Sequence, residues 1–307
     1  MTPATHLPGP GRTALVTGAT AGIGYHTARA LARSGIHVII TGRDPDAGER
    51  AVATIRDEAH SDLVAFLRAD HSTVGGNKDL ADRVSATAPR LDLLVNNVGG
   101  LYPTRWETAD GYEATLAMNF IGPYVLTAEL LSLLRASAPS RCLNVVSAGF
   151  KMWKTDPFAD LQSTRRFISG DAYAHTKLLN VLASLAWARR LTGDQITVNV
   201  VHPGMSWTQM TQSMTAQSLP SLRLAWPLLR LLQRRGSPAK AGNRVAFVAS
   251  SPDTIDYTGQ YFEGRRTPSR LSARELDPQN QDRAWQLGAE LMATAPTHHQ
   301  HQPESDK

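Results

Sequence analysis

The chain has 307 residues, of which 42% are hydrophobic and 19% charged, and a net charge of +5. This balance argues against a disordered or membrane-embedded chain, and the length suffices for one large α/β domain or two small ones. The single cysteine, Cys142, excludes an internal disulfide and a cysteine-rich metal cluster. Basic residues are spread along the chain, which argues against general nucleic-acid binding.

Residues 1–11 lack a secretory signal pattern and no run approaches about 20 apolar residues, so we expect a cytoplasmic protein that does not associate with membranes.

Short apolar runs alternate with longer helical patterns. Strands are predicted at residues 14–17, 37–41, 64–69, 91–96, 142–147 and 196–202, where Val, Ile and Leu occur without strict alternation, as in parallel strands buried on both faces. Helices are predicted at residues 22–34, 45–60, 78–88, 121–136 and 172–192. The alternation predicts an α/β fold, a Rossmann-type doubly wound parallel β-sheet flanked by helices on both faces, in a single domain over residues 12–264.

The composition changes after the last predicted strand. Residues 208–235 are rich in Met, Leu, Trp and Arg, and we expect one or two short amphipathic helices broken by Pro220 and Pro227. We favour a lid over a substrate pocket for this segment, with a membrane-surface anchor as the alternative. Residues 265–295 form a C-terminal extension that the sequence does not place in detail. Residues 1–11 and 296–307 are expected to be a flexible start and a disordered tail.

A glycine-rich loop lies between the first predicted strand and the first predicted helix. Residues 18–24 read G-A-T-A-G-I-G, and glycines let the backbone approach a pyrophosphate while the helix presents free N–H groups and the positive end of its dipole. The spacing is G-x-x-x-G-x-G and not the commoner G-x-G-x-x-G, so alone it could be a chance cluster. The cofactor-binding candidates here are Gly18, Thr20, Ala21, Gly22, Ile23 and Gly24.

The second predicted strand ends in T-G-R-D at residues 41–44, where dinucleotide enzymes contact the adenosine ribose. A carboxylate at this tip would pair with the ribose hydroxyls of NAD, whereas the guanidinium of Arg43 suits the 2′-phosphate of NADP. Asp44 could compete as a ribose ligand, but we favour it as the cap of the helix that begins at Pro45. The sequence therefore predicts NADP(H) as the cofactor.

Three more patterns follow at predicted strand ends and at a helix start. N-N-V-G occupies residues 96–99, Ser147 ends the fifth strand, and Y-A-H-T-K occupies residues 173–177. Tyr173 and Lys177 share a helix face, and a nearby ammonium group stabilises a phenolate and lowers its pKa from about 10 towards the working range. Ser147 could donate a hydrogen bond to a substrate oxygen. Each pattern alone is common, but together and in this order they indicate one site.

These patterns, with P-G at residues 203–204, resemble the short-chain dehydrogenase/reductase family across residues 12–264. The retinol dehydrogenase-like and protochlorophyllide reductase-like branch is similar through T-A-D-G-Y-E at 108–113, M-N-F-I-G-P at 118–123, A-P-S-R at 138–141 and Y-A-H-T-K-L-L-N at 173–180. The resemblance implies that Tyr173 exchanges the proton, that Lys177 lowers its pKa and binds the nicotinamide ribose, and that Ser147 orients the carbonyl. It also implies that Asn119 holds a water on a proton path from Lys177.

The resemblance implies further contacts with the cofactor. This set comprises Asp70 at the adenine, Asn97 steadying the central sheet, Pro203, Gly204 and Thr208 at the nicotinamide, and also His71 and Gly99. Three residues depart from the family pattern. Val98 stands in place of Ala, for which we expect a small shift near the adenosine. His71 replaces Leu or Val, and we favour a structural over a catalytic role; Ser206 replaces a frequent Val, where a backbone contact should survive.

Large apolar residues dominate the positions that would face the substrate by analogy: Tyr102, Gly149, Phe150, Met152, Trp153, Trp207 and part of residues 219–232. We predict substrate contacts from Ser147, Phe150 and Trp207, and a hydrophobic ketone, aldehyde or alcohol as substrate, with core packing as the alternative for each apolar residue. No metal is expected. The leading function is an NADP(H)-dependent carbonyl reductase or alcohol dehydrogenase acting by hydride transfer. The alternative is an NADP(H)-binding regulatory protein without turnover.

The oligomeric state stays open between a monomer and a homo-oligomer. By the resemblance, family members often associate through the helices predicted at residues 121–136 and 172–192, although the branch includes monomers.

Overall fold

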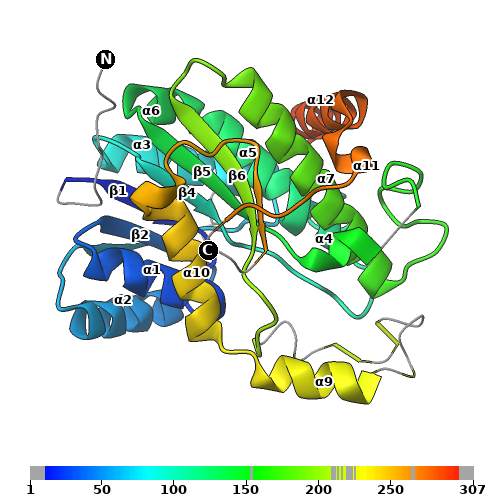
Figure 1. Ribbon diagram of the computed structural model, residues 1–307, viewed down its shortest axis with the longest axis horizontal. Helices are drawn as coiled ribbons and strands as arrows, with labels where there is room; N and C mark the ends of the chain where they lie inside the picture. The colour runs from blue at the N-terminus through cyan, green and yellow to red at the C-terminus, as the bar shows by residue number, and fades with distance from the viewer. Residues whose placement is uncertain are drawn as a thin grey trace, which may run out of the picture.

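A computed structural model describes residues 11–152, 155–208, 212, 214–215, 217–218, 224, 226–263 and 267–296. At its centre lies one parallel sheet in the order β3-β2-β1-β4-β5-β6-β7 (Figure 1). The strands are β1 (Thr13–Val16), β2 (His37–Gly42), β3 (Val64–Arg68), β4 (Leu93–Asn96), β5 (Ser140–Val145), β6 (Ile196–His202) and β7 (Tyr261–Glu263). The chain moves outward from β1 to β3 and returns to β4 beside β1. The carboxyl ends of β1 and β4 therefore flank the crevice where doubly wound sheets bind ligands.

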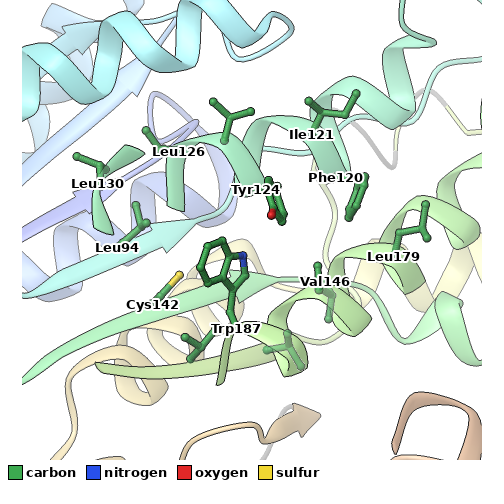
Figure 2. Close-up of a cluster of buried hydrophobic side chains, with 14 of the residues drawn as sticks. Leu94, Phe120, Ile121, Tyr124, Leu126, Leu130, Cys142, Val146, Leu179 and Trp187 are labelled. Atoms are coloured by element: carbon green, nitrogen blue, oxygen red, sulfur yellow. The ribbon is translucent and has the colours of Figure 1, made fainter. Parts of the chain in front are cut away.

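Helices cover both faces of the sheet (Figure 1). One face is covered by α1 (Gly22–Arg33), α2 (Pro45–Ala59) and α10 (Pro238–Ser250), whose apolar residues form one buried cluster with the strands. The other is covered by α3 (Val74–Thr87), α5 (Gly122–Glu129) and α7 (Ser169–Arg190), which contribute to a second cluster. Figure 2 shows part of this second cluster, with Tyr124 and Trp187 facing each other between the helices. The Rossmann-type fold expected from the sequence is confirmed.

The predicted strands are all present, with ends that differ by two residues at most. The short β7, which pairs with β6, was not predicted, because three residues carry no periodicity of their own. The helix predicted at residues 78–88 begins earlier, at Val74, because the Thr73 hydroxyl accepts a hydrogen bond from the backbone N–H of Gly76 and caps it.

A single helix over residues 121–136 is wrong. The chain forms α4 (Ala114–Leu116), the π-helical turn η1 (Ala117–Ile121), α5, and then α6 (Leu131–Ala136). Leu130, with φ −83° and ψ 0°, separates α5 from α6. A π-turn widens the helix locally and is common at functional sites, and this one contains Asn119.

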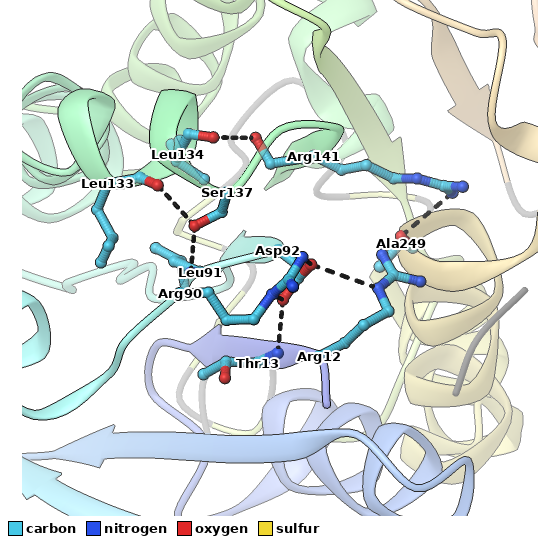
Figure 3. Close-up of polar contacts among 11 residues, drawn as sticks. Arg12, Thr13, Arg90, Leu91, Asp92, Leu133, Leu134, Ser137, Arg141 and Ala249 are labelled. Atoms are coloured by element: carbon cyan, nitrogen blue, oxygen red, sulfur yellow. Dashed lines mark hydrogen bonds and ion pairs between the residues drawn. The ribbon is translucent and has the colours of Figure 1, made fainter. Parts of the chain in front are cut away.

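Polar contacts pin the amino ends of the central strands (Figure 3). The buried Asp92 carboxylate accepts hydrogen bonds from the backbone N–H of Thr13, at 2.8 Å, and from the Arg90 guanidinium, at 2.6 and 2.9 Å. The buried guanidinium of Arg141 donates to the carbonyl oxygen of Ser251 and to the Thr254 hydroxyl, both at 3.0 Å. These contacts lie at the edge opposite the crevice, so they stabilise the sheet without entering the site.

The C-terminal extension, which the sequence does not place, packs against the body of the fold. It forms α11 (Ala273–Leu276) and α12 (Pro278–Thr294). The Trp285 ring meets the Trp187 ring edge to face at 5.8 Å between centroids, and Gly288 lies against Tyr124 so closely that a Cβ atom there would come within 2.4 Å of the ring. Helix α12 thus covers part of α7 and α5, the helices by which related chains were expected to associate.

Candidate active site

A cavity of about 500 Å³ opens at the carboxyl ends of the central strands. Its walls come from the loop after β1, from the ends of β2, β4, β5 and β6, and from the start of α7. The predicted site residues that line it are Gly18, Thr20, Ala21, Gly22, Ile23, Arg43, His71, Asn97, Gly99, Ser147, Tyr173, Lys177, Pro203, Gly204 and Thr208. Five predicted residues do not line it, namely Gly24, Asp70, Asn119, Phe150 and Trp207.

The glycine loop has the geometry of a phosphate cradle. Gly18 and Gly22 both adopt φ near +61°, in the left-handed region that favours glycine. The residue before α1, Ala21, has no side-chain oxygen to cap the first N–H groups of the helix, so these groups and the helix dipole face the cavity. Asn97 holds the loop from the β4 side, its Nδ2 donating to the carbonyl oxygens of Thr17 and Gly18 at 2.9 and 3.1 Å.

Gly24 does not line the cavity, and its role is to allow close packing of α1. A Cβ atom at this position would come within 2.5 Å of the Gly18 carbonyl oxygen and of Asn97 Nδ2. The absence of a side chain therefore lets α1 approach the loop that precedes it.

At the end of β2 the described lining of the cavity carries a cation and no carboxylate. Arg43 is exposed and lines the cavity, whereas the Asp44 side chain accepts hydrogen bonds from the backbone N–H groups of Asp46 and Ala47 at 2.9 and 3.2 Å. Asp44 is thus the cap of α2, the role favoured from the sequence. Among the described lining residues there is no Asp or Glu, while Arg43 and Lys177 supply positive charge at two separate points.

Ser147, Tyr173 and Lys177 converge where β5 ends and α7 begins. Burial raises the pKa of Tyr173 to about 12, and the Ser147 side chain acts in the opposite direction, so the lower pKa expected from the nearby Lys177 is not found. Burial lowers the pKa of Lys177 to about 8. The Lys177 ammonium donates to the Val145 carbonyl oxygen at 3.1 Å and lies 5.8 Å from the centre of the Tyr173 ring. A phenol, a hydroxyl donor and a cation therefore share one wall of the cavity.

Asn119 lies behind this wall. Its fully buried side chain accepts a hydrogen bond from the backbone N–H of Gly100 and donates to the Gly100 carbonyl oxygen, both at 2.9 Å. A Cβ atom on Gly99 would lie 2.9 Å from both Asn119 Oδ1 and Lys177 Nζ. Gly99 thus provides the space in which Asn119 and Lys177 come close to each other.

Two predicted substrate contacts are not part of the cavity wall. Phe150 is fully buried and packs edge to face against Tyr261, with 5.4 Å between ring centroids, so its ring belongs to the core. The Trp207 ring faces the Arg230 and Arg234 guanidinium groups of α9 (Trp226–Arg235) at 4.7 and 5.4 Å from its centre. The core-packing alternative therefore holds for Phe150, and Trp207 anchors a neighbouring helix.

Of the other predicted contacts, Asp70, Tyr102 and Gly149 do not line the cavity. The Asp70 carboxylate is exposed and accepts hydrogen bonds from the backbone N–H and hydroxyl of Ser72, so it lies beside the cavity wall and not in it. The Tyr102 ring packs edge to face on Trp106 at 5.3 Å, and Gly149 is absent from the lining. Trp153 and the side chain of Met152 lie outside the described residues.

Several lining residues were not predicted. Leu101, Met118, His202, Met214 and Gln233 also face the cavity, together with Val98, Met205 and Ser206. Met118 and His202 stand next to motif residues in sequence, so adjacency was the available signal for them. Met214 and Gln233 belong to residues 208–235, the segment for which the sequence favours a lid over the pocket, but which of its residues reach the cavity depends on how the segment folds. Most of these additions are apolar, and they enlarge the hydrophobic part of the site.

Helix α9 lies at the outer edge of the molecule (Figure 1). Pro227 does not break this helix, because it stands in the first turn, where a missing N–H costs nothing; Pro220 lies outside the described residues. One face carries Arg230 and Arg234 against Trp207, while Leu228 and Leu231 on the other are 59% and 47% exposed. Nowhere in the described part of the chain is a helix both long and apolar enough to cross a membrane.

Comparisons with known proteins point to one family. A profile described as short chain dehydrogenase matches residues 12–219. Human retinol dehydrogenase 12 is 34% identical over 294 residues, which cover 94% of this chain and 88% of that protein. Mouse polyprenol dehydrogenase is 35% identical over 291 residues, which cover 92% of this chain and 84% of that protein.

Solved structures of other proteins have the same fold as this chain. An uncharacterised protein from Mycobacterium paratuberculosis aligns with a TM-score of 0.72 at 27% identity, covering 94% of this chain and 96% of that one. An RhlG/NADP active-site complex from Pseudomonas aeruginosa aligns with a TM-score of 0.65 at 28% identity, covering 87% of this chain and 99% of that one.

Proposed function

Because the chain belongs to the short-chain dehydrogenase family, in its retinol dehydrogenase-like branch, we propose that it is an NADP(H)-dependent oxidoreductase that interconverts a hydrophobic ketone or aldehyde and its alcohol. The observation that carries the proposal is that Ser147, Tyr173 and Lys177 line one cavity together with a phosphate cradle, with the Lys177 ammonium 5.8 Å from the centre of the Tyr173 ring. A regulator without turnover would not need this arrangement, and the comparisons do not favour it.

The cavity fits a dinucleotide with an extra phosphate. Gly18 and Gly22 let the backbone approach a pyrophosphate at the start of α1, and Arg43 would pair with a 2′-phosphate. Asp44 is committed to capping α2, so the carboxylate that would favour NAD is engaged elsewhere. Lys177 would bind the nicotinamide ribose, with Pro203, Gly204 and Thr208 beside the ring. When bound, the nicotinamide supplies or accepts the hydride.

Proton transfer would fall to the residues at the end of β5 and the start of α7. In the reducing direction, the Tyr173 hydroxyl gives its proton to the substrate oxygen as the carbonyl carbon is reduced; in the oxidising direction, the phenolate takes that proton back. Ser147 holds the substrate oxygen near Tyr173 by a hydrogen bond. The Lys177 cation stabilises the phenolate electrostatically. Asn119 would hold a water on the path that returns the proton to Lys177.

The substrate proposal rests on the apolar part of the cavity. Leu101, Met118, Val146, Met205 and Met214 present hydrocarbon and thioether surface to the cavity that Tyr173 also lines, which suits an apolar compound with one reactive oxygen. Relatives named for retinol and for a polyprenol support this substrate class. We propose that α9, which places Gln233 in the lining, is the lid of this pocket. The cytoplasmic location stays a prediction.

The test is a panel of hydrophobic aldehydes and ketones, each offered to the purified protein with NADPH and, separately, with NADH. We expect oxidation of NADPH with at least one carbonyl and a preference for NADPH over NADH. Preference for NADH would overturn the cofactor assignment. NADPH binding without oxidation by any carbonyl or reduction of NADP by any alcohol would support the regulatory alternative.

A further inference from the structure

We propose that His71 is a positioning residue for the phosphate loop: its imidazole orients the Thr41 hydroxyl, which in turn holds the backbone N–H of Gly18. The inference rests on the proposed NADP(H) site and assigns His71 a role distinct from the direct cofactor contact that the resemblance implies. It also gives a reason for a histidine at a position where the family pattern has an aliphatic residue.

A continuous chain of hydrogen bonds links the loop to the start of α3. The Gly18 N–H lies 3.2 Å from Thr41 Oγ1, Thr41 Oγ1 lies 2.7 Å from His71 Nε2, and His71 Nδ1 lies 2.9 Å from Asn77 Oδ1. Thr41 and Asn77 are fully buried and His71 is 5% exposed. Water therefore competes little for these bonds, and an unmade one would leave a polar group unsatisfied.

The direction of each bond follows from Asn77. Its Nδ2 donates to the carbonyl oxygens of Thr73 and His71, at 2.7 and 3.3 Å, so its Oδ1 faces the imidazole as an acceptor. Nδ1 of His71 must then carry the proton, which leaves Nε2 as an acceptor. Thr41 donates its one hydroxyl proton to Nε2, and a lone pair of its oxygen faces the Gly18 N–H. Burial lowers the pKa of His71, while the hydrogen bond that His71 donates to Asn77 and the charge of Asp70 act in the opposite direction. The lowered pKa keeps the ring neutral at pH 7, as this arrangement requires.

Thr41 holds two consecutive residues of the cradle. Besides the contact of its hydroxyl with Gly18, its carbonyl oxygen accepts the backbone N–H of Ala19 at 3.0 Å. Asn97 holds the carbonyl oxygens of the same loop from the other side. With an aliphatic residue at position 71, the Thr41 hydroxyl would be free to rotate away from Gly18. The loop would then have to be ordered when the cofactor binds, which lowers affinity without changing the chemistry.

The experiment compares NADPH dissociation constants and steady-state rates for the wild type, His71→Leu, His71→Gln and Thr41→Val. Glutamine can place its Oε1 near the position of Nε2 and so keep the acceptor, whereas leucine cannot. We expect His71→Leu and Thr41→Val each to raise the NADPH dissociation constant about 5- to 10-fold, the value of one buried hydrogen bond. His71→Gln should stay within about twofold of the wild type, and kcat at saturating NADPH should be unchanged in all three.

The double variant His71→Leu/Thr41→Val should bind NADPH no more weakly than the weaker single variant, because both changes remove the same contact. The matched control is His37→Leu, which alters a histidine at the opposite end of the same strand, β2, and should leave NADPH binding unchanged. Unchanged NADPH affinity in His71→Leu, equal losses in His71→Leu and His71→Gln, or additive losses in the double variant would overturn the inference. If the wild type itself binds no NADPH, it is the proposed function that fails.

Discussion

The Ser147 side chain, at the end of β5, lines the same cavity as Tyr173 on α7 and counteracts the rise in the pKa of Tyr173 that burial causes. In the proposed mechanism, this helix residue and this strand-end residue present two hydroxyl groups to the same substrate oxygen. We expect Ser147→Ala to lower kcat about 10²- to 10³-fold, as removal of one donor to a developing oxyanion does elsewhere, while the NADPH dissociation constant stays constant. Ser34→Ala, which removes an exposed hydroxyl at the end of α1, is the control. A loss of NADPH affinity equal to the loss of rate would contradict the assigned role.

Arg43 and Asp44 are adjacent in sequence but differ in their expected effect on cofactor choice. Arg43→Ala should raise KM for NADPH about 10- to 100-fold, the value of a hydrogen-bonded charge, and leave KM for NADH unchanged. Asp44→Ala should lower the free energy of unfolding by about 1 kcal/mol, because α2 loses its cap, without changing the preference for NADPH. Initial rates with both cofactors and denaturant titrations measure the two effects. A shift of preference in Asp44→Ala alone would contradict the NADP(H) assignment.

The pH dependence should follow from Lys177. Burial lowers the pKa of its ammonium to about 8, so in the free protein the cation is present below this pH and is lost above it. We therefore expect kcat/KM for NADPH to fall as the pH rises through about 8, because kcat/KM reports the ionisation of the free protein. Lys177→Arg, whose guanidinium stays charged, should show a lower rate without this decline. A profile for the wild type that is flat from pH 7 to 9.5 would contradict the role of the cation.

The proposed lid depends on contacts between α9 and Trp207. The double variant Arg230→Ala/Arg234→Ala removes both guanidinium groups from the indole face, and each such contact is worth about 0.5–1 kcal/mol. We expect KM for the carbonyl substrate to rise about fivefold and the NADPH dissociation constant to stay constant. Arg235→Ala, on the exposed side of α9, is the control.

A flotation assay with liposomes distinguishes the lid from a membrane-surface anchor. If α9 is a lid, the protein should remain with the lipid-free fraction. Co-flotation that is lost in Leu228→Ser/Leu231→Ser, which alters the exposed leucines, would contradict the lid and favour the anchor.

The sequence was most informative where the pattern is local. Buried parallel strands are continuous apolar runs, so their positions were predictable to within two residues. The glycine loop, Arg43 and the Tyr173–Lys177 pair lie at strand ends and at a helix start, and the doubly wound topology brings these edges to one cavity. The role of Asp44 was also predictable, because a carboxylate before Pro45 is a local capping signal.

Features that depend on tertiary contacts were not predictable. Phe150 was assigned to the pocket by analogy, but the adjacent β7, which itself was missed, supplies Tyr261 as its packing partner in the core. The break at Leu130 in the helix predicted over residues 121–136, and the π-turn that precedes α5, are local backbone changes that apolar periodicity does not reveal. A position over the pocket was expected for residues 208–235, but the entry of Gln233 into the cavity depends on how that segment folds, and α12 is placed by aromatic packing on α7.

Tyr173→Phe tests the central claim most directly. The substitution removes one oxygen atom, so the cavity and the cofactor contacts should persist, but no proton donor remains at the substrate oxygen. The measurement is NADPH binding by titration together with NADPH oxidation in the presence of a carbonyl that the wild type reduces. We predict an NADPH dissociation constant within about twofold of the wild type and a rate lower by at least about 10²-fold. Undiminished turnover in Tyr173→Phe would contradict the assignment of Tyr173 as the acid and base of the reaction.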